Sequence, residues 1–275
     1  MDNTSAIAIP LTCIAPGRWT TVAGEEWSNP GGGLWGGYAI GLAIRVVESE
    51  PEAQGEVLSL TVTYAAALPS GALDIRTRRL RQGGSVGIWE AEVLPAGSDQ
   101  VGAHCILTTA RRPRTPSFAF ATMPDAPAPE SLPTLEIPGM ALRYGAAAFE
   151  RRAVEGYPPE PSESSRSLAW VRSRGGSMDK ALLGMVTDHS PPRAMYALGR
   201  SVRTTTLSLT AYLHATAEEI AEVGDDFILV ECEGRVGNAG ASDERSSYWS
   251  RSGKLLATSE QLAWYRDAQG NAVGG

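Results

Sequence analysis

Cysteine and histidine are scarce in this sequence of 275 residues, which contains three of each. The cysteines, Cys13, Cys105 and Cys232, are odd in number and far apart, so neither a disulfide framework nor a paired-cysteine metal motif can be drawn from them. No histidine has a second histidine or a pair of carboxylates at ligand spacing. We therefore expect no metal and no cofactor, and the sparse cysteines fit a reducing cytoplasm.

The sequence is also short of positive charge and of long apolar runs. Its net charge is −7 and its pI about 5.1, and an acidic surface repels phosphate backbones, which argues against nucleic acid as a partner. No stretch approaches about 18 uninterrupted apolar residues, and the first residues lack the basic and apolar regions of a signal peptide. We expect a cytoplasmic globular protein without a membrane partner.

The commoner catalytic motifs are missing as well. The segment GGGLWGG at 31–37 is rich in glycine, but it has neither the lysine of a phosphate-binding loop nor a preceding strand. No GxSxG motif offers a nucleophilic serine on a sharp turn. These absences exclude the commoner hydrolases and nucleotide-binding proteins.

Proline, in contrast, is concentrated in one segment. Seven of the 18 prolines fall within 113–139, and each fixes the backbone φ angle and removes a hydrogen-bond donor. Neither a helix nor a central strand survives such a composition. We predict a linker over 113–143, between an N-terminal domain at 1–112 and a C-terminal domain at 144–275.

Both halves show the same order of elements, a helix followed by antiparallel strands. In the first half a helical apolar stripe follows Gly36, and strand-like runs cover 57–68, 72–82, 85–95 and 100–112. In the second half a short helix over 178–192 stops at two prolines, and strand-like runs cover 204–215, 227–237, 244–252 and 254–266. A helix with an antiparallel sheet is an α+β unit.

Short identities between the halves support a duplication. The tetrapeptide LSLT at 58–61 recurs at 207–210, an offset of 149 residues, and Leu107 can be placed opposite Gln261 at an offset of 154. Nearly equal offsets together with an equal order of elements predict two copies of one unit.

Three polar residues distinguish the second copy from the first. Asp188 follows the short helix, Thr206 begins a strand and Gln261 lies inside the last strand, whereas Val57 and Leu107 stand opposite the latter two. We expect Val57 and Leu107 to line the equivalent place in the first copy with apolar atoms only. A polar residue in a core position costs free energy unless it has a partner, so an Asp, a Thr and a Gln that converge would suit a bound water. Each also has a structural reading: a turn residue, a β-former and a solvent-facing amide.

The chain resembles the acyl-CoA thioesterase II family, in which two hotdog units are fused in one chain. The resemblance rests on three short motifs and a closing hairpin, which are WSNPGGGLWGGYAIGLAIR, TDHSPP, TLSLTAYLH and the segment from Tyr248 to Gln261. It implies a double hotdog, with two helix-plus-antiparallel-sheet units that form one continuous sheet. It further implies acyl-CoA as the substrate and a homo-oligomer of double-hotdog chains.

The same resemblance implies residue roles. The family's Asp falls on Asp188, its Thr on Thr206 and its Gln on Gln261, which would together hold and activate the water that hydrolyses a thioester.

Further members of the expected site are less specific. The Gly36 and Gly37 backbone N–H groups would bind the oxyanion. Ser208 and Thr210 are alternative hydroxyls, because period-two alternation would place them on the same strand face as Thr206.

Two other functions stay open at this point. A protein of the same fold that binds acyl-CoA without catalysis, or acts as a scaffold, would keep the architecture and lose the chemistry. A hotdog enoyl-CoA hydratase needs a helix-borne Asp/His pair, and the adjacent Asp188 and His189 have the wrong spacing for it.

Overall fold

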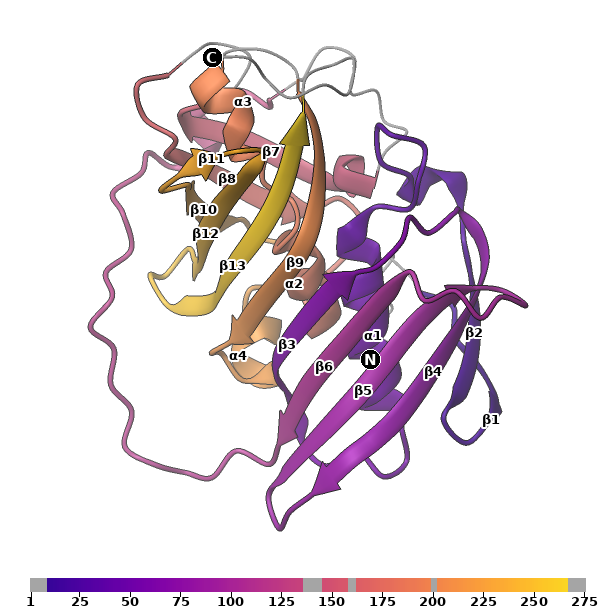
Figure 1. Ribbon diagram of the computed structural model, residues 1–275. Helices are drawn as coiled ribbons and strands as arrows, with labels where there is room; N and C mark the ends of the chain where they lie inside the picture. The colour runs from indigo at the N-terminus through magenta and orange to yellow at the C-terminus, as the bar shows by residue number, and fades with distance from the viewer. Residues whose placement is uncertain (1–8, 136–144, 158–161, 199–201, 267–275) are drawn as a thin grey trace.

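The computed structural model of the protein describes residues 9–135, 145–157, 162–198 and 202–266. In this part of the chain, 13 strands form one antiparallel sheet that curves around the helices (Figure 1). Each helix of the described residues is too short or too polar to traverse a lipid bilayer. The expectation of an α+β double hotdog with one continuous sheet is confirmed.

The elements follow the same order in both halves. The N-terminal half contains β1 (Thr12–Ala15), β2 (Arg18–Ala23), α1 (Gly36–Ser49), β3 (Glu56–Tyr64), β4 (Gly71–Gln82), β5 (Val86–Pro95) and β6 (Ala103–Ala110). The C-terminal half contains β7 (Phe149–Glu155), β8 (Ser167–Ser173), α2 (Lys180–Val186), α3 (Arg193–Leu198), β9 (Arg203–Leu213), α4 (Ala217–Ala221), β10 (Ile228–Glu233), β11 (Gly237–Asn238), β12 (Ala241–Ser250) and β13 (Leu255–Arg266). Along the sheet the order is β1-β2-β4-β5-β6-β3-β9-β13-β12-β10-β8-β7, with β11 beside β12.

The helical region of the second half and four strands of the sheet differ from what the sequence predicts. The predicted helix over 178–192 is shorter, since α2 begins after the N-cap Asp179, which accepts the Leu182 N–H, and ends at Val186. A separate helix, α3, follows the two prolines. The strands β1, β2, β7 and β8 were not predicted; they lie at the two ends of the sheet and are only four to seven residues long.

The two halves join where β3 pairs with β9, and the pairing is symmetric. Thr61 lies opposite Thr210, its counterpart at the offset of 149, and their Oγ1 atoms are 3.0 Å apart. Ser59 pairs with Tyr212, the counterpart of Thr63, and Thr63 pairs with Ser208, the counterpart of Ser59. This is the self-complementary arrangement of a two-fold interface, here within one chain.

The repeat alignment also predicts the strand register. Leu60 pairs with Leu107 in the first half and Leu209 with Gln261 in the second, which is the same pairing at offsets of 149 and 154. Both halves also contain a bulge two residues before these leucines, at Leu58 in β3 and at Leu207 in β9. The bulge is therefore a feature of the unit and not a local defect.

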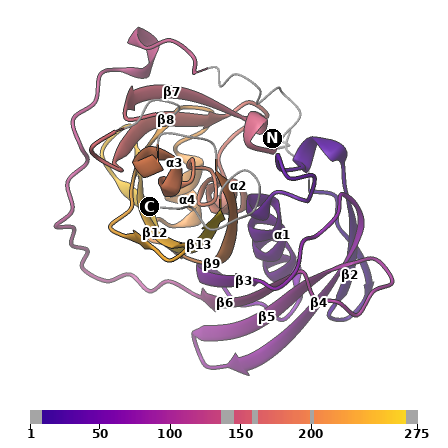
Figure 2. The same cartoon turned by 45° about the horizontal axis from the view of Figure 1, so that its top comes forward.

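The helices α1 and α2 pack closely against each other inside the sheet (Figure 2). A Cβ on Gly41 would lie 2.6 Å from Cε of Met185, and a Cβ on Gly184 would lie 2.4 Å from Cδ1 of Ile44. The helix α1 is apolar on nearly all sides and its residues from Gly37 to Val47 are buried except Arg45, as expected for a helix enclosed by a sheet. The two glycines set the distance between the halves.

The end of the proline-rich linker covers the outer face of the C-terminal half. Figure 1 shows residues 113–128 as an extended strand-free segment that passes outside that half. Trp170 donates its indole N–H to the Pro127 carbonyl at 2.8 Å, and Arg251 forms an ion pair with Glu130 at 2.7 Å. Met123, Ala126 and Leu132 lie against a second small core, which consists of Leu168, Trp170, Phe227, Leu229 and Trp249. The predicted remainder of the linker, 136–143, lies outside the described residues.

We expect Gly41→Val to destabilise the protein, because the larger side chain must displace Met185 or separate the helices. Overpacking of this kind costs about 1–3 kcal/mol. Chemical denaturation measures it as a lower free energy of unfolding. Gly84→Val is the control, since nothing lies within 4 Å of a Cβ there. Equal stability of the two variants would contradict the close helix contact.

Candidate active site

The backbone of Asp188 is fixed where the two halves meet. Its N–H donates to the Met185 carbonyl at 3.2 Å, which continues the last turn of α2. Its carbonyl accepts the indole N–H of Trp35 at 3.1 Å. Trp35 is the N-cap of α1, so the end of one helix is tied to the start of the other.

The carboxyl group of Asp188 lies against the first turn of α1. The Gly37 N–H donates a hydrogen bond to it. A Cβ on Gly36 would lie 2.7 Å from Asp188 Oδ2, so only glycine allows this approach. A helix N-terminus carries unpaired N–H groups and a partial positive charge, and both stabilise a carboxylate.

Burial nevertheless dominates the protonation of this group. Burial, with a smaller contribution from the charge of the neighbouring Glu244, raises the pKa of Asp188 to about 7, although interactions with Gly37 and Thr206 act to lower it. A base with a pKa near neutrality is suited to general base catalysis at neutral pH.

A β-bulge turns Thr206 toward Asp188. Thr206 pairs with Ala263, whereas Ser208 pairs with Leu262, so Leu207 is the extra residue between them. The Thr206 hydroxyl lies 3.5 Å from Asp188 Oδ1, a long hydrogen bond that it donates.

The same bulge shows that the alternative hydroxyls were wrongly placed. Ser208 pairs with the exposed Leu262, and the Thr210 hydroxyl contacts Thr61 on the outer face. Period-two alternation would put both beside Thr206, but the bulge reverses the faces. Ser208 and Thr210 therefore point away from Asp188.

Gln261 faces the inner side of the sheet. It pairs with the buried Leu209, and its neighbours Glu260 and Leu262 are exposed, as alternation along β13 requires. Within the described residues its Oε1 atom is buried and has no hydrogen-bond partner. A buried acceptor without a donor is costly, so this oxygen suits a water or a ligand donor.

Glu244 is a second buried carboxyl group that the sequence did not reveal. It pairs directly with Gln261 across β12 and β13, is 4% exposed, and forms an ion pair with Arg193 at 3.3 Å. Burial raises the pKa of Glu244, and Arg193 opposes this. The strand segment ASDERSSYWS carries polar residues on both faces, so periodicity alone gave no reason to place a glutamate inside.

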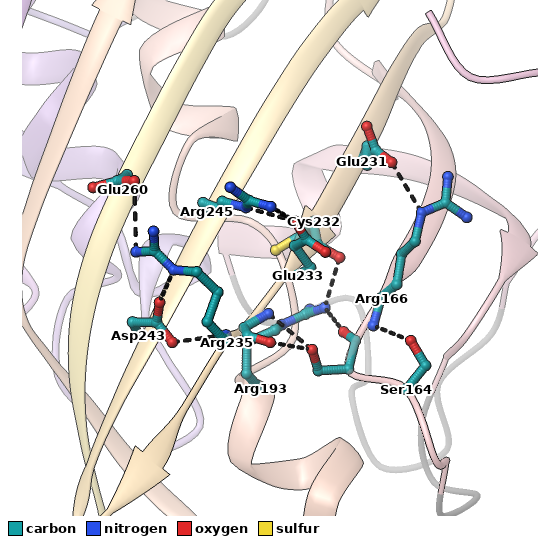
Figure 3. A network of polar contacts seen from close by, with 12 residues as sticks. Ser164, Arg166, Arg193, Glu231, Cys232, Glu233, Arg235, Asp243, Arg245 and Glu260 are labelled. Atoms are coloured by element: carbon teal, nitrogen blue, oxygen red, sulfur yellow. Dashed lines mark hydrogen bonds and ion pairs between the residues drawn. The ribbon is translucent and has the colours of Figure 1, made fainter.

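The guanidinium of Arg193 is itself held by several acceptors. It donates to the carbonyls of Pro191, Ser165 and Cys232. Figure 3 shows Arg193 beside Cys232. On the opposite face of the same strands, Asp243 pairs with Arg235 in an exposed ion pair (Figure 3). Glu244 thus faces inward, whereas the residue before it in the strand, Asp243, lies on the outer face.

Tyr64 is the other residue that the sequence analysis missed. It ends β3 in the N-terminal half, and its oxygen is buried without a hydrogen-bond partner among the described residues. Its Oη atom would lie 2.7 Å from a Cβ on Gly36, the same separation as for Asp188 Oδ2. The site therefore draws Trp35, Gly36, Gly37 and Tyr64 from one half and Asp188, Thr206, Gln261 and Glu244 from the other.

The equivalent place in the other copy contains ion pairs. Aligning Gly41 with Gly184 puts Arg45 at the position of Asp188, and Arg45 pairs with Asp179 at the start of α2 at 2.6 Å. Lys180 binds Glu56 at 2.9 Å and the Val57 carbonyl at 3.0 Å.

The side chains expected to line that place differ from the prediction in one respect. Val57 and Leu107 are buried, as expected, but an apolar lining alone was wrong, because Lys180 and the buried Thr109 add polar groups. A carboxylate also lies on the helix N-terminus there, since Asp179 caps α2, but it is held in the ion pair with Arg45.

His189 does not pair with Asp188. Its ring packs on Trp35 and Phe149, at centroid distances of 6.5 and 5.1 Å, and its Nε2 accepts the Arg151 Nε–H at 2.8 Å. The two adjacent residues point to different partners, so they do not form the acid–base pair of a hydratase.

Comparison with known families identifies the architecture. The profile of the acyl-CoA thioesterase N-terminal domain matches residues 24–112, and that of the acyl-CoA thioesterase C-terminal domain matches residues 117–265. The chain belongs to the acyl-CoA thioesterase family. The two matches cover most of the chain, and they confirm the resemblance that the short motifs indicated.

Solved structures share the fold over the whole chain. A hotdog protein of unknown function from Alicyclobacillus acidocaldarius has 25% identity and a TM-score of 0.88, covering 95% of this chain and 97% of its own. A protein described as a thioesterase from Novosphingobium aromaticivorans has 23% identity and a TM-score of 0.80, covering 94% and 99%. An acyl-CoA thioesterase II from Mycobacterium marinum has 17% identity and a TM-score of 0.72, covering 96% and 98%. A search among curated proteins gave no match.

We expect Glu244→Gln to lower the pKa of Asp188, because it removes a negative neighbour. The midpoint of the pH–rate profile for thioester hydrolysis should therefore move below about 7, the pKa of Asp188 in the parent. Glu260→Gln, on the outer face of the adjacent strand, is the control and should leave the midpoint unchanged. An unchanged midpoint in Glu244→Gln would show that its charge does not reach Asp188.

Proposed function

We propose that this protein hydrolyses acyl-CoA thioesters and that Asp188 is the general base. The observation that carries the proposal is the half-buried carboxyl group of Asp188, with a pKa of about 7, placed on the N-terminus of α1. Membership of the acyl-CoA thioesterase family supports the reaction class and the substrate class.

The reaction needs one water and no covalent intermediate. Asp188 removes a proton from the water while the water oxygen attacks the thioester carbonyl carbon. The resulting tetrahedral oxyanion collapses, the bond from carbon to the CoA sulfur breaks, and the sulfur takes the proton. The products are a carboxylic acid and CoA.

Thr206 and Gln261 orient the water in this proposal. The Thr206 hydroxyl lies beside Asp188 Oδ1, and the unpaired Gln261 Oε1 can accept a hydrogen bond from the second O–H group of the water. Gln261 lies two residues from Ala263, the strand partner of Thr206, which is about 7 Å along an inner face. That spacing suits one water between an amide and a hydroxyl.

The two glycines have different roles. The Gly37 N–H lies beside the Asp188 carboxylate and lowers its pKa, so we assign this N–H to the carboxylate. The Gly36 N–H has no acceptor within the described part of the chain. We propose Gly36 as the backbone donor to the oxyanion, in place of the expected pair.

Asp188→Asn should lower the rate of thioester hydrolysis roughly 10²-fold or more, because it removes the base and keeps the volume. Binding of acyl-CoA should change little. The test is release of CoA thiol from a ladder of acyl-CoA chain lengths. Asp99→Asn is the matched control, since the Asp99 side chain is 97% exposed. Full activity of Asp188→Asn would assign the base to another group.

The parent rate should rise about tenfold per pH unit below pH 7 and level off above it, because only deprotonated Asp188 accepts a proton. A pH–rate profile of kcat/KM measures this. A profile that is flat from pH 5 to 8 would contradict Asp188 as base. Binding of acyl-CoA without turnover at any chain length would favour a non-catalytic binding protein.

A further inference from the structure

The hydroxyl of Tyr64 has no role in holding the fold together. Its oxygen is buried and, within the described residues, neither donates nor accepts a hydrogen bond. A buried hydroxyl without a partner costs free energy, and most such groups in native proteins are paired. An unpaired one beside a candidate site therefore calls for a ligand that pairs with it.

The position of this hydroxyl is defined by Gly36. The place where a Gly36 side chain would begin lies 2.7 Å from Tyr64 Oη and 2.7 Å from Asp188 Oδ2. The two oxygens are therefore no more than twice that distance apart, and they are not hydrogen-bonded to each other. At this separation one oxygen can bind the attacking water while the other binds the carbonyl oxygen that the water attacks.

The two groups differ in what they can do with a proton. Burial, with a further contribution from the Asp188 charge, raises the pKa of Tyr64 well above its usual value of 10. The phenol stays protonated throughout the working pH range, so it acts as a hydrogen-bond donor and not as a base. Asp188, with a pKa of about 7, is the complementary acceptor.

We infer that Tyr64 is a catalytic residue that donates its hydroxyl proton, as a hydrogen bond, to the carbonyl oxygen of the bound thioester. The inference rests on the proposed thioester hydrolysis. It places the donor on β3 of the N-terminal half and the base after α2 of the C-terminal half, on either side of Gly36.

The proton and electron balance is simple. When water attacks the carbonyl carbon, Asp188 takes the water proton and the carbonyl π electrons move to the oxygen. The Tyr64 O–H and the Gly36 N–H donate to that oxyanion, and Tyr64 keeps its proton. The electrons return as the carbon–sulfur bond breaks, and the proton leaves with the CoA sulfur.

Tyr64→Phe is the direct test. Losing one oxyanion donor typically costs about 10²–10³-fold in kcat, and KM should change little because the interaction strengthens in the transition state. The melting temperature should stay equal or rise, because an unpaired buried hydroxyl is removed. Tyr38→Phe is the control: the Tyr38 hydroxyl is likewise buried without a hydrogen-bond partner among the described residues, but Tyr38 lies on α1 against Trp27. Its kcat should equal that of the parent.

A spectroscopic experiment separates a donor from a residue that only fills space. An acyl-CoA labelled with ¹³C at the carbonyl is bound to the inactive Asp188→Asn variant, and its C=O stretch is recorded by infrared difference spectroscopy. The hydrogen bond from Tyr64 should lower the frequency, and the shift should disappear in Asp188→Asn/Tyr64→Phe. An S-alkyl-CoA thioether, which has no carbonyl, should bind the parent and Tyr64→Phe equally.

The outcomes distinguish the inference from the function on which it rests. A parent that releases no CoA from any acyl-CoA contradicts the proposed function. A parent that is active, together with an inactive Asp188→Asn and a fully active Tyr64→Phe, contradicts only the role of Tyr64. Equal losses in Tyr64→Phe and Tyr38→Phe, with lower melting temperatures in both, would also overturn it.

Discussion

The site depends on one contact: the carboxyl group of Asp188 packed on the first turn of α1. It requires a glycine at position 36, because any Cβ would meet Asp188 Oδ2 at 2.7 Å. It also requires the Trp35 indole to hold the Asp188 carbonyl. Both residues belong to one half of the chain and Asp188 to the other, so the site exists only when the two hotdog units pack together.

Duplication built this contact, and divergence left it in one copy. The pairing of β3 with β9, the two bulges and the facing glycines of α1 and α2 all follow the two-fold symmetry of the repeat. At the other symmetry-related place, Arg45 occupies the position of Asp188, and the carboxylate on the helix N-terminus, Asp179, is held in an ion pair with Arg45. A carboxylate held in an ion pair is not free to act as a base. The contact between Arg45 and Asp179 joins the two helices, whereas the contact of Asp188 with α1 leaves a carboxyl group that is not paired with a cation among the described residues.

Much of the fold could be predicted from the sequence, because the repeat offsets of 149 and 154 encode the strand register and the joined sheet. Asp188 and Thr206 were predicted to lie together, and they do. Ser208 and Thr210 were misplaced because a bulge reverses the alternation and leaves no signal in composition. Glu244 and Tyr64 were missed because each looks ordinary in its strand, and only tertiary packing buries their oxygens.

The raised pKa of Asp188 also makes the stability of the protein depend on pH. The folded-state pKa of Asp188, about 7, lies above its ordinary value of 3.8, so the folded protein binds this proton more tightly than the unfolded chain. The contribution to stability is fully present below pH 3.8 and is lost as pH rises toward 7. The most direct measurement is a ¹³C NMR titration of the side-chain carboxyl of Asp188, assigned with Asp188→Asn. The expected midpoint is about 7, and a midpoint near 3.8 would contradict the account.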